Sequence, residues 1–172
     1  MSADSLAAPA TPVALLAAWE AAATPAQTAA QLPHQPAVLA CLTALLVQLP
    51  ADINVDLEDA RTVLHGAGSL RAAPAAANGP ARVAEALRQL RAALPGVAAQ
   101  RALLCLSSSP AAPLEMDELT ELTEAIHAQE LRNEGELVFG HGELPAAAPD
   151  ELRVWLLLAY APDTPPLAAS LQ

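Results

Sequence analysis

The fold is decided by residues 53–64, which read Ile-Asn-Val-Asp-Leu-Glu-Asp-Ala-Arg-Thr-Val-Leu. Asp56 is a good helix N-cap, because its carboxylate can accept hydrogen bonds from the free backbone N–H groups of the first turn. Glu58 and Asp59 then fall in that first turn, where negative charge interacts favourably with the helix dipole. The segment therefore predicts a short loop followed by a helix from Asp56 to about His65.

An apolar helix is predicted before this loop. Residues 34–49 are apolar at nearly every position, which is typical of a buried helix, and Pro50 ends it. Residues 50–56 are predicted to form the loop itself. Residues 1–33 are rich in alanine and proline and predict a short helical N-terminal extension.

The residues after the loop alternate between helix and strand patterns. Apolar residues at helical spacing occupy 82–94 and 115–129, and short apolar runs typical of strands occupy 102–106, 136–139 and 152–160. Residues 69–80 read as a loop or a poor edge strand, because Pro74 lacks a backbone donor. These elements predict an α/β (α+β) fold, a mixed sheet of about four strands packed with helices, in a domain over 34–162 followed by a flexible tail at 163–172.

The helical spacing also predicts which side chains face the core. In residues 82–94 we expect the apolar positions to be buried and Arg82 to point away from them. In residues 115–129 we expect Met116 to face inward and Glu118 to face outward.

Composition excludes several classes of site. The chain has 172 residues, 8 of them basic and 19 acidic, for a net charge of -11, and it contains no lysine. A phosphate-binding loop of the Gly-x-x-x-x-Gly-Lys type and a lysine Schiff base are therefore impossible in this sequence. Nucleic acids and anionic membrane surfaces repel a protein of this charge, so we expect neither as a partner.

The location and redox state are predicted from apolar runs and cysteines. The run at residues 37–47 is about half the length of a membrane span, and the N-terminus carries no basic segment of a signal peptide. We therefore expect a cytoplasmic protein with no membrane span. Cys41 and Cys105 lie in apolar runs, which predicts buried thiols rather than a disulfide or a zinc site.

Residues 53–59 resemble the loop that opens the C-terminal (activation) domain of FtsZ, the tubulin-like bacterial cell-division GTPase. The family pattern is Ile-Asn-x-Asp-x-x-Asp followed by an Arg- or Lys-Thr-Val helix, and Asn54, Asp56 and Asp59 match it residue by residue. Individually weaker matches follow in the same order, among them Gly66-Ala67-Gly68, Val138-Phe139-Gly140 and Leu152-Arg153-Val154. The resemblance covers about residues 36–161 and implies the fold of that domain, with residues 34–49 as a remnant of the family's central helix.

The resemblance also implies a chain without the family's GTP-binding domain, since the Gly-Gly-Gly-Thr-Gly-Thr-Gly loop is not in this sequence. In the family, this loop reaches the GTP site of the next protomer, where its carboxylates orient the attacking water and hold a cation. Asn54, Asp56 and Asp59 would then contact a partner's nucleotide. The chain would have no catalytic residue, cofactor or metal site of its own. Helix capping alone is the other interpretation of both aspartates.

Three functions follow from this resemblance. The first is a non-enzymatic protein that binds or regulates the tubulin-like division cytoskeleton, capping a filament through residues 53–59, with FtsZ, another tubulin-like protein or itself as partner. The second is one half of a split hydrolase, completed by a separate nucleotide-binding chain along the helix at residues 36–48. The third is a repurposed scaffold or oligomerisation domain.

Other polar groups have simpler interpretations. His141 with Glu143 predicts a polar turn, and His127 with Glu124 and Glu130 predicts a solvated helix face rather than a metal site. Residues 107–109 are three serines without the Gly-x-Ser-x-Gly pattern of a nucleophile elbow, and we expect a loop there.

Overall fold

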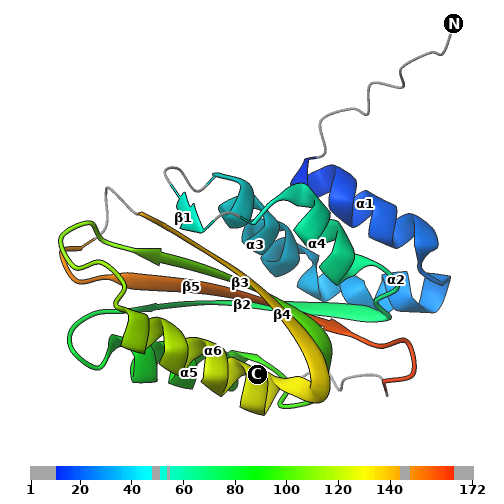
Figure 1. The fold of residues 1–172 in the computed structure, drawn as a ribbon. Helices are drawn as coiled ribbons and strands as arrows, with labels where there is room; N and C mark the ends of the chain where they lie inside the picture. Colours follow the sequence, from blue (N-terminus) through cyan, green and yellow to red (C-terminus); the bar gives the residue numbers. More distant parts are fainter. Residues whose placement is uncertain (1–10, 48–50, 54, 144–147, 165–172) are drawn as a thin grey trace, which may run out of the picture.

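The chain folds as a sheet with helices on both faces (Figure 1). A computed structural model describes residues 11–47, 51–53, 55–143 and 148–164. Its helices are α1 (Pro12–Ala22), α2 (Pro25–Gln31), η1 (Leu32–His34), α3 (Gln35–Val47), α4 (Leu57–Leu64), α5 (Arg82–Ala93) and α6 (Met116–Glu130). Its strands are β1 (Ala51–Ile53), β2 (Ser69–Ala77), β3 (Ala99–Ser108), β4 (Leu131–Glu143) and β5 (Leu152–Tyr160).

The sheet has the order β1-β4-β3-β5-β2. β3 and β4 are parallel and are joined by α6, whereas every other neighbouring pair is antiparallel. The predicted mixed α/β sheet is therefore confirmed, with four long strands and a short β1. The central strand β3 is the apolar run of the sequence, and all its residues from Ala102 to Leu106 are 0% exposed because both faces are covered.

Two cores lie on opposite faces of the sheet. α5 and α6 cover one face, and α1, α3 and α4 cover the other (Figure 1). Because side chains alternate along a strand, Leu104 of β3 enters the first core, while its neighbours Leu103 and Cys105 enter the second. Cys41 of α3 is buried in the same second core, so the predicted burial of both thiols is confirmed, and burial raises the pKa of Cys41.

The N-terminal helix α1 shares the second core. Its residues Leu15, Leu16 and Trp19 are buried against α3 and α4. The indole Nε1 of Trp19 donates a hydrogen bond of 2.9 Å to the backbone oxygen of Ala67, just after α4. The helical segment predicted for residues 1–33 is thus packed, over its described part, on the helix that follows the candidate loop.

Residues 69–77, predicted as a loop or a poor strand, form the edge strand β2. Their backbone groups point alternately toward β5 and outward, and those of Leu70 and Ala76 point outward. The side-chain amide of Gln31 bonds both the N–H and the C=O of Leu70, each at 2.9 Å. Gln89 does the same for Ala76 at 3.1 and 3.0 Å. Pro74 also faces outward, and proline has no N–H that could donate to another strand. The outer edge of β2 therefore offers few free backbone groups for pairing with another strand.

Two other segments differ from the sequence-based expectation. Residues 51–53, expected within the 50–56 loop, form β1, and residues 141–143, expected in a turn, extend β4 to pair with it. The backbone pairing of these two segments depends on residues far apart in the chain, which the local pattern does not contain. Met116, expected to face inward, is the first residue of α6 and is 72% exposed, so this expectation is wrong.

Replacing Glu130 by methionine is expected to stabilise the fold. Glu130 is 7% exposed, its Oε2 accepts no hydrogen bond from the described residues, and burial raises its pKa. A raised folded-state pKa means that stability is lost as the pH rises above the ordinary carboxyl value. We expect Glu130→Met to raise the free energy of unfolding at pH 7 by about 1 kcal/mol.

Chemical denaturation at pH 7 and at pH 4 measures this effect. The advantage of Glu130→Met over the natural chain should shrink at pH 4, where the buried carboxyl is protonated. Glu124→Met, at an exposed position of the same helix, is the matched control and should show no such pH dependence. A pH-independent advantage for Glu130→Met would contradict the assignment of the cost to the buried charge.

Candidate functional site

Asp56 and Asp59 form a capping box at the start of α4. One oxygen of Asp56, Oδ1, accepts hydrogen bonds from the backbone N–H groups of Glu58 (2.8 Å) and Asp59 (2.9 Å). In return, Oδ2 of Asp59 accepts one from the N–H of Asp56 at 3.0 Å. The predicted N-cap is therefore confirmed, and both carboxylates stabilise the helix terminus.

Each carboxylate keeps one oxygen outside this box. None of the described residues donates to Oδ2 of Asp56 or to Oδ1 of Asp59. Asp56 is exposed and Asp59 half-buried. Between them, Glu58 pairs with Arg61 on the same helix. Asn54, the third predicted residue, lies outside the described residues. Capping thus leaves acceptor atoms at the surface that can meet a partner.

Gly140 of β4 packs closely against Ile53 and Val55 of this loop. A Cβ atom at Gly140 would lie 2.8 Å from Cγ2 of Val55 and 3.0 Å from the backbone oxygen of Ile53. The next residue of β4, His141, is paired with Ile53 in the sheet. Only glycine allows the loop to approach β4 so closely, which gives a physical reason for the Phe-Gly pair noted in the sequence.

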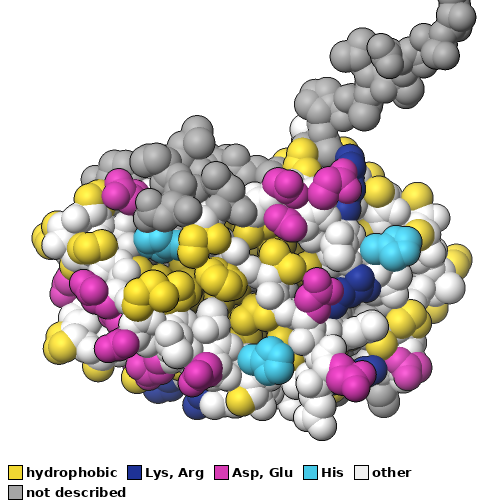
Figure 2. Space-filling view, in the orientation of Figure 1, with side chains coloured by type: hydrophobic (Ala, Val, Ile, Leu, Met, Phe, Trp, Pro, Cys, Tyr) yellow, Lys and Arg dark blue, Asp and Glu magenta, His cyan; other side chains and the backbone are white. Residues whose placement is uncertain are grey.

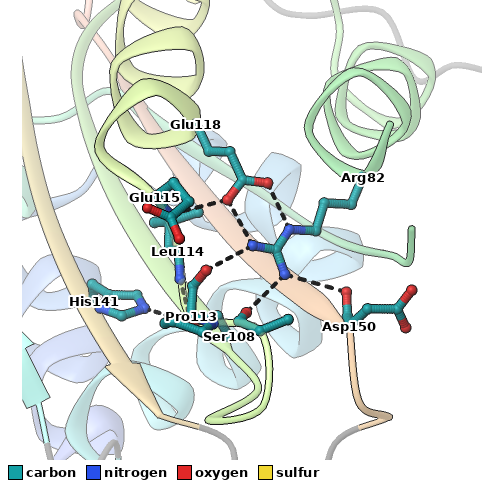
Figure 3. Close-up of polar contacts among 9 residues, drawn as sticks. Arg82, Ser108, Pro113, Leu114, Glu115, Glu118, His141 and Asp150 are labelled. Atoms are coloured by element: carbon teal, nitrogen blue, oxygen red, sulfur yellow. Dashed lines mark hydrogen bonds and ion pairs between the residues drawn. The ribbon is translucent and has the colours of Figure 1, made fainter. Parts of the chain in front are cut away.

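A buried arginine, Arg82 of α5, lies on the other face of the sheet from α4, near the end of β3 and the start of β5 (Figure 3). Arg82 of α5 is 5% exposed, and its Nε and Nη2 donate to the two carboxylate oxygens of Glu118 in α6 at 2.7 and 2.6 Å. Its remaining bonds go to backbone oxygens of Ala112 (2.9 Å), Pro113 (3.0 Å) and Asp150 (3.3 Å). The expectation that Arg82 points away from the core and Glu118 faces outward is wrong. One guanidinium joins two helices and two loops.

The sequence contains a signal for this pair. Arg82 precedes the buried Ala86 by four residues, and Glu118 precedes the buried Leu122 by four. Positions four apart share a helix face, so both charges lie on inward faces. Opposite charges on the inner faces of two predicted helices would have indicated the ion pair.

Ser108 and His141 form a second buried polar contact beside it. Oγ of Ser108 lies 2.8 Å from Nε2 of His141 and accepts a hydrogen bond of 3.1 Å from the backbone N–H of Leu114 (Figure 3). The two side chains are 1% and 7% exposed. They belong to β3 and β4, so the loop and the polar turn expected at these positions are wrong. The pair fixes the end of β4 that carries β1, and its burial keeps the hydroxyl from solvent.

The remaining candidates do not converge. His127 and Glu124 are exposed on α6, whereas Glu130 of the same helix is buried. Within the described ranges, no three or more His, Cys, Asp or Glu side chains are grouped to hold a metal ion. None of the described helices has the length and apolar character needed to cross a bilayer.

Comparison with solved structures shows a shared fold. FtsZ from M. jannaschii, as an empty dimer, superposes with a TM-score of 0.61 at 17% identity, over 71% of this chain and 36% of that one. A mutant of the same FtsZ gives a TM-score of 0.58 at 17% identity, over 73% and 36%. A GTPγS-form protofilament of TubZ from Bacillus thuringiensis serovar israelensis gives 0.51 at 10% identity, over 72% and 35%.

These similarities confirm the predicted FtsZ/tubulin-like resemblance at the level of the fold. The chain spans about a third of the length of each of these proteins. No protein-family model and no curated protein matches the sequence.

Proposed function

We propose that this chain is a non-enzymatic binding partner of a tubulin-like protein, which it contacts through the loop at residues 53–59 and the start of α4. The observation that carries the proposal is the position of Asp56 and Asp59. Within a fold shared with FtsZ and TubZ, they stand at the surface with one carboxylate oxygen each outside the capping box. We expect the protein to act in the cytoplasm.

The similar structures support a filament protein as the partner. The FtsZ structure is a dimer, and the TubZ structure is a protofilament. This chain shares its fold with about a third of each of those proteins, and it can present one contact surface to the end of such an assembly. Bound there through residues 53–59, it would occupy the surface that the next subunit needs, so growth of that end would stop. FtsZ itself, another tubulin-like protein and a second copy of this chain are the candidate partners.

The contact with the partner would be held mainly by electrostatic interactions. A nucleotide site in a partner contains phosphates and the cation that neutralises them, and a carboxylate supplied from outside can hold that cation or orient water. Asp56 and Asp59 are suited to this role because capping already fixes their orientation. This chain would then bind no nucleotide of its own.

The split-hydrolase alternative has less support. It requires the helix at residues 36–48 to be the contact with a separate nucleotide-binding chain. In α3, the side chains of Val38, Cys41 and Leu42 are at most 1% exposed, packed between α1 and the sheet. That apolar face is therefore already covered within this chain.

Removing the carboxylates without removing the caps tests the proposal. In the double variant Asp56→Ser and Asp59→Gln, serine still caps the helix and glutamine still completes the capping box. We expect folding stability to be nearly unchanged and the affinity for FtsZ assembled with GTP to fall about tenfold, or 1.4 kcal/mol. Co-sedimentation and phosphate release, measured against added chain, report binding, polymer mass and GTP turnover.

Asp117→Asn, which removes one acidic charge from the first turn of α6, is the matched control and should bind as the natural chain does. Binding of the double variant at full affinity would overturn the role of the two aspartates. Absence of any binding by the natural chain, to FtsZ and to itself, would overturn the proposed function altogether.

A further inference from the structure

A pocket of about 520 Å³ lies between α1 and the end of α4. Its walls are mostly apolar and include Leu15, Trp19 and Leu64. Its volume falls in the range of small-molecule binding sites, roughly 300–1,000 Å³. α1 forms one of its walls, and the pocket lies at the opposite end of α4 from the capping box, so it is separate from the loop discussed above.

Small side chains on α1 create this hollow. Leu15, Ala18, Trp19 and Ala22 follow one another at the spacing of a single helix face. Leu15 and Trp19 are buried, whereas Ala18 and Ala22 remain exposed and line the pocket. An amphipathic helix usually fills such a face with large side chains, so the two alanines leave room for an external molecule.

The wall opposite α1 is held in place without a ligand. The hydrogen bond from Trp19 to Ala67 fixes the indole ring. Gly68 packs so closely on Pro162 that a Cβ atom there would lie 2.5 Å from its Cα, and the N–H of Gly68 donates to the oxygen of Tyr160 at 2.8 Å. The pocket is therefore preformed, and binding would not require the ordering of a loop.

The charge at the rim identifies the class of ligand. The polar side chains that line the pocket are Thr24, Gln27, Arg61 and His65, and none of the acidic residues in the described part of the chain lines it. Elsewhere acidic side chains are scattered over the surface, as the face in Figure 2 shows, and the whole chain has a net charge of -11. Arg61 pairs with Glu58 through Nη1, which leaves its other N–H groups for a second anion.

From the apolar walls and the basic side chains at this rim, we propose that the pocket binds a single-chain carboxylate amphiphile of the fatty-acid type. Its hydrocarbon chain would lie between α1 and α4, and its carboxylate would bind at Arg61 and His65. A second hollow of about 460 Å³ shares His65 and Pro162 with the pocket, but it is lined by Glu134 and Glu136 as well as Arg101. The carboxylates there would repel the head group, which therefore stays at the first rim.

Titration with dodecanoate, dodecanol and dodecyltrimethylammonium, each below its micelle concentration, tests the proposal. Calorimetry gives the stoichiometry, and fluorescence of Trp19 in a Trp155→Phe background locates the site. We expect one saturable site that binds dodecanoate about tenfold more tightly than the cationic amphiphile. The overall charge of the chain favours the cation, so only the local rim produces this order.

Three variants localise the binding. Ala18→Leu should fill the hollow and weaken dodecanoate binding about tenfold, while Ala17→Leu, on a position of α1 that does not line the pocket, should leave it unchanged. Arg61→Gln should remove the preference for dodecanoate over dodecanol. Circular dichroism confirms that each variant folds. Stronger binding of the cation, several weak sites, or equal affinities of the two alanine variants would overturn the proposal.

Discussion

Replacing Arg82 by methionine is expected to lower the free energy of unfolding by about 3 kcal/mol, because it removes the buried guanidinium that donates to Glu118 and to three backbone oxygens. Methionine has a similar length and no charge, so the loss measures the polar contacts rather than a cavity. Denaturation by urea, followed by circular dichroism, measures the change. The loops that end at Ala112, Pro113 and Asp150 should also exchange their amide hydrogens faster.

The pH dependence separates the ion pair from general packing. Hydrogen bonds from Arg82 hold the pKa of Glu118 below its ordinary value. The carboxylate therefore stabilises the fold above that ordinary value, and this contribution is lost as the pH falls through the lowered folded-state pKa. The Arg82→Met variant should lose this part of the acid sensitivity.

Arg88→Met is the matched control, because Arg88 lies on the same helix and pairs with Glu85 at the surface. It should change stability little. Equal effects of the two substitutions, or an Arg82→Met variant whose acid sensitivity matches that of the natural chain, would contradict the role of the buried pair.

Replacing Gln31 by leucine is the second large effect that we expect, a loss of about 2–4 kcal/mol. Gln31 is 0% exposed, and its amide satisfies both backbone groups of Leu70 at the edge of β2. Leucine has a comparable volume but no polar atoms, so a buried N–H and a buried C=O would lose their partners. Thermal and urea denaturation measure the loss.

The same substitution should make the chain associate. With Gln31 gone, α2 is no longer bonded to the edge of β2, and backbone groups of an edge strand are a template for pairing with another chain. Light scattering at increasing protein concentration should show association of the Gln31→Leu variant.

Gln89→Leu is the control, since Gln89 makes the equivalent two bonds to Ala76 at a more exposed position, where water can replace it. Its effect on stability should be clearly smaller. A Gln31→Leu variant as stable and as monomeric as the natural chain would show that these bonds do not protect the edge.

Much of the fold was predictable because periodicity is a local property. The apolar spacing in residues 82–94 and 115–129 identified α5 and α6, and apolar runs identified β3 and β5. β2 was nearly missed because Pro74 argues against a strand in general but not against one on an outward-facing edge position. β1 and the last residues of β4 were missed because each is stabilised as a strand by the other.

The capping box at the start of α4 shows what the sequence by itself determined. Its hydrogen bonds join residues two or three positions apart, so the spacing of Asp56 and Asp59 was enough to predict them. The resemblance to FtsZ was also visible in that spacing, and the fold agrees with it.

Only the tertiary structure decided the contacts between distant segments. Arg82 and Glu118 are 36 residues apart, Ser108 and His141 are 33 apart, and Gln31 and Leu70 are 39 apart. Gln31, Ser108 and His141 are ordinary polar residues in their local patterns, and only the inward helical positions of Arg82 and Glu118 give a local signal. Whether each side chain is exposed or buried depends on which helix and strand pack beside it. A helix cap is a contact within one turn, whereas a buried polar partner exists only after the sheet has brought its strands and helices together.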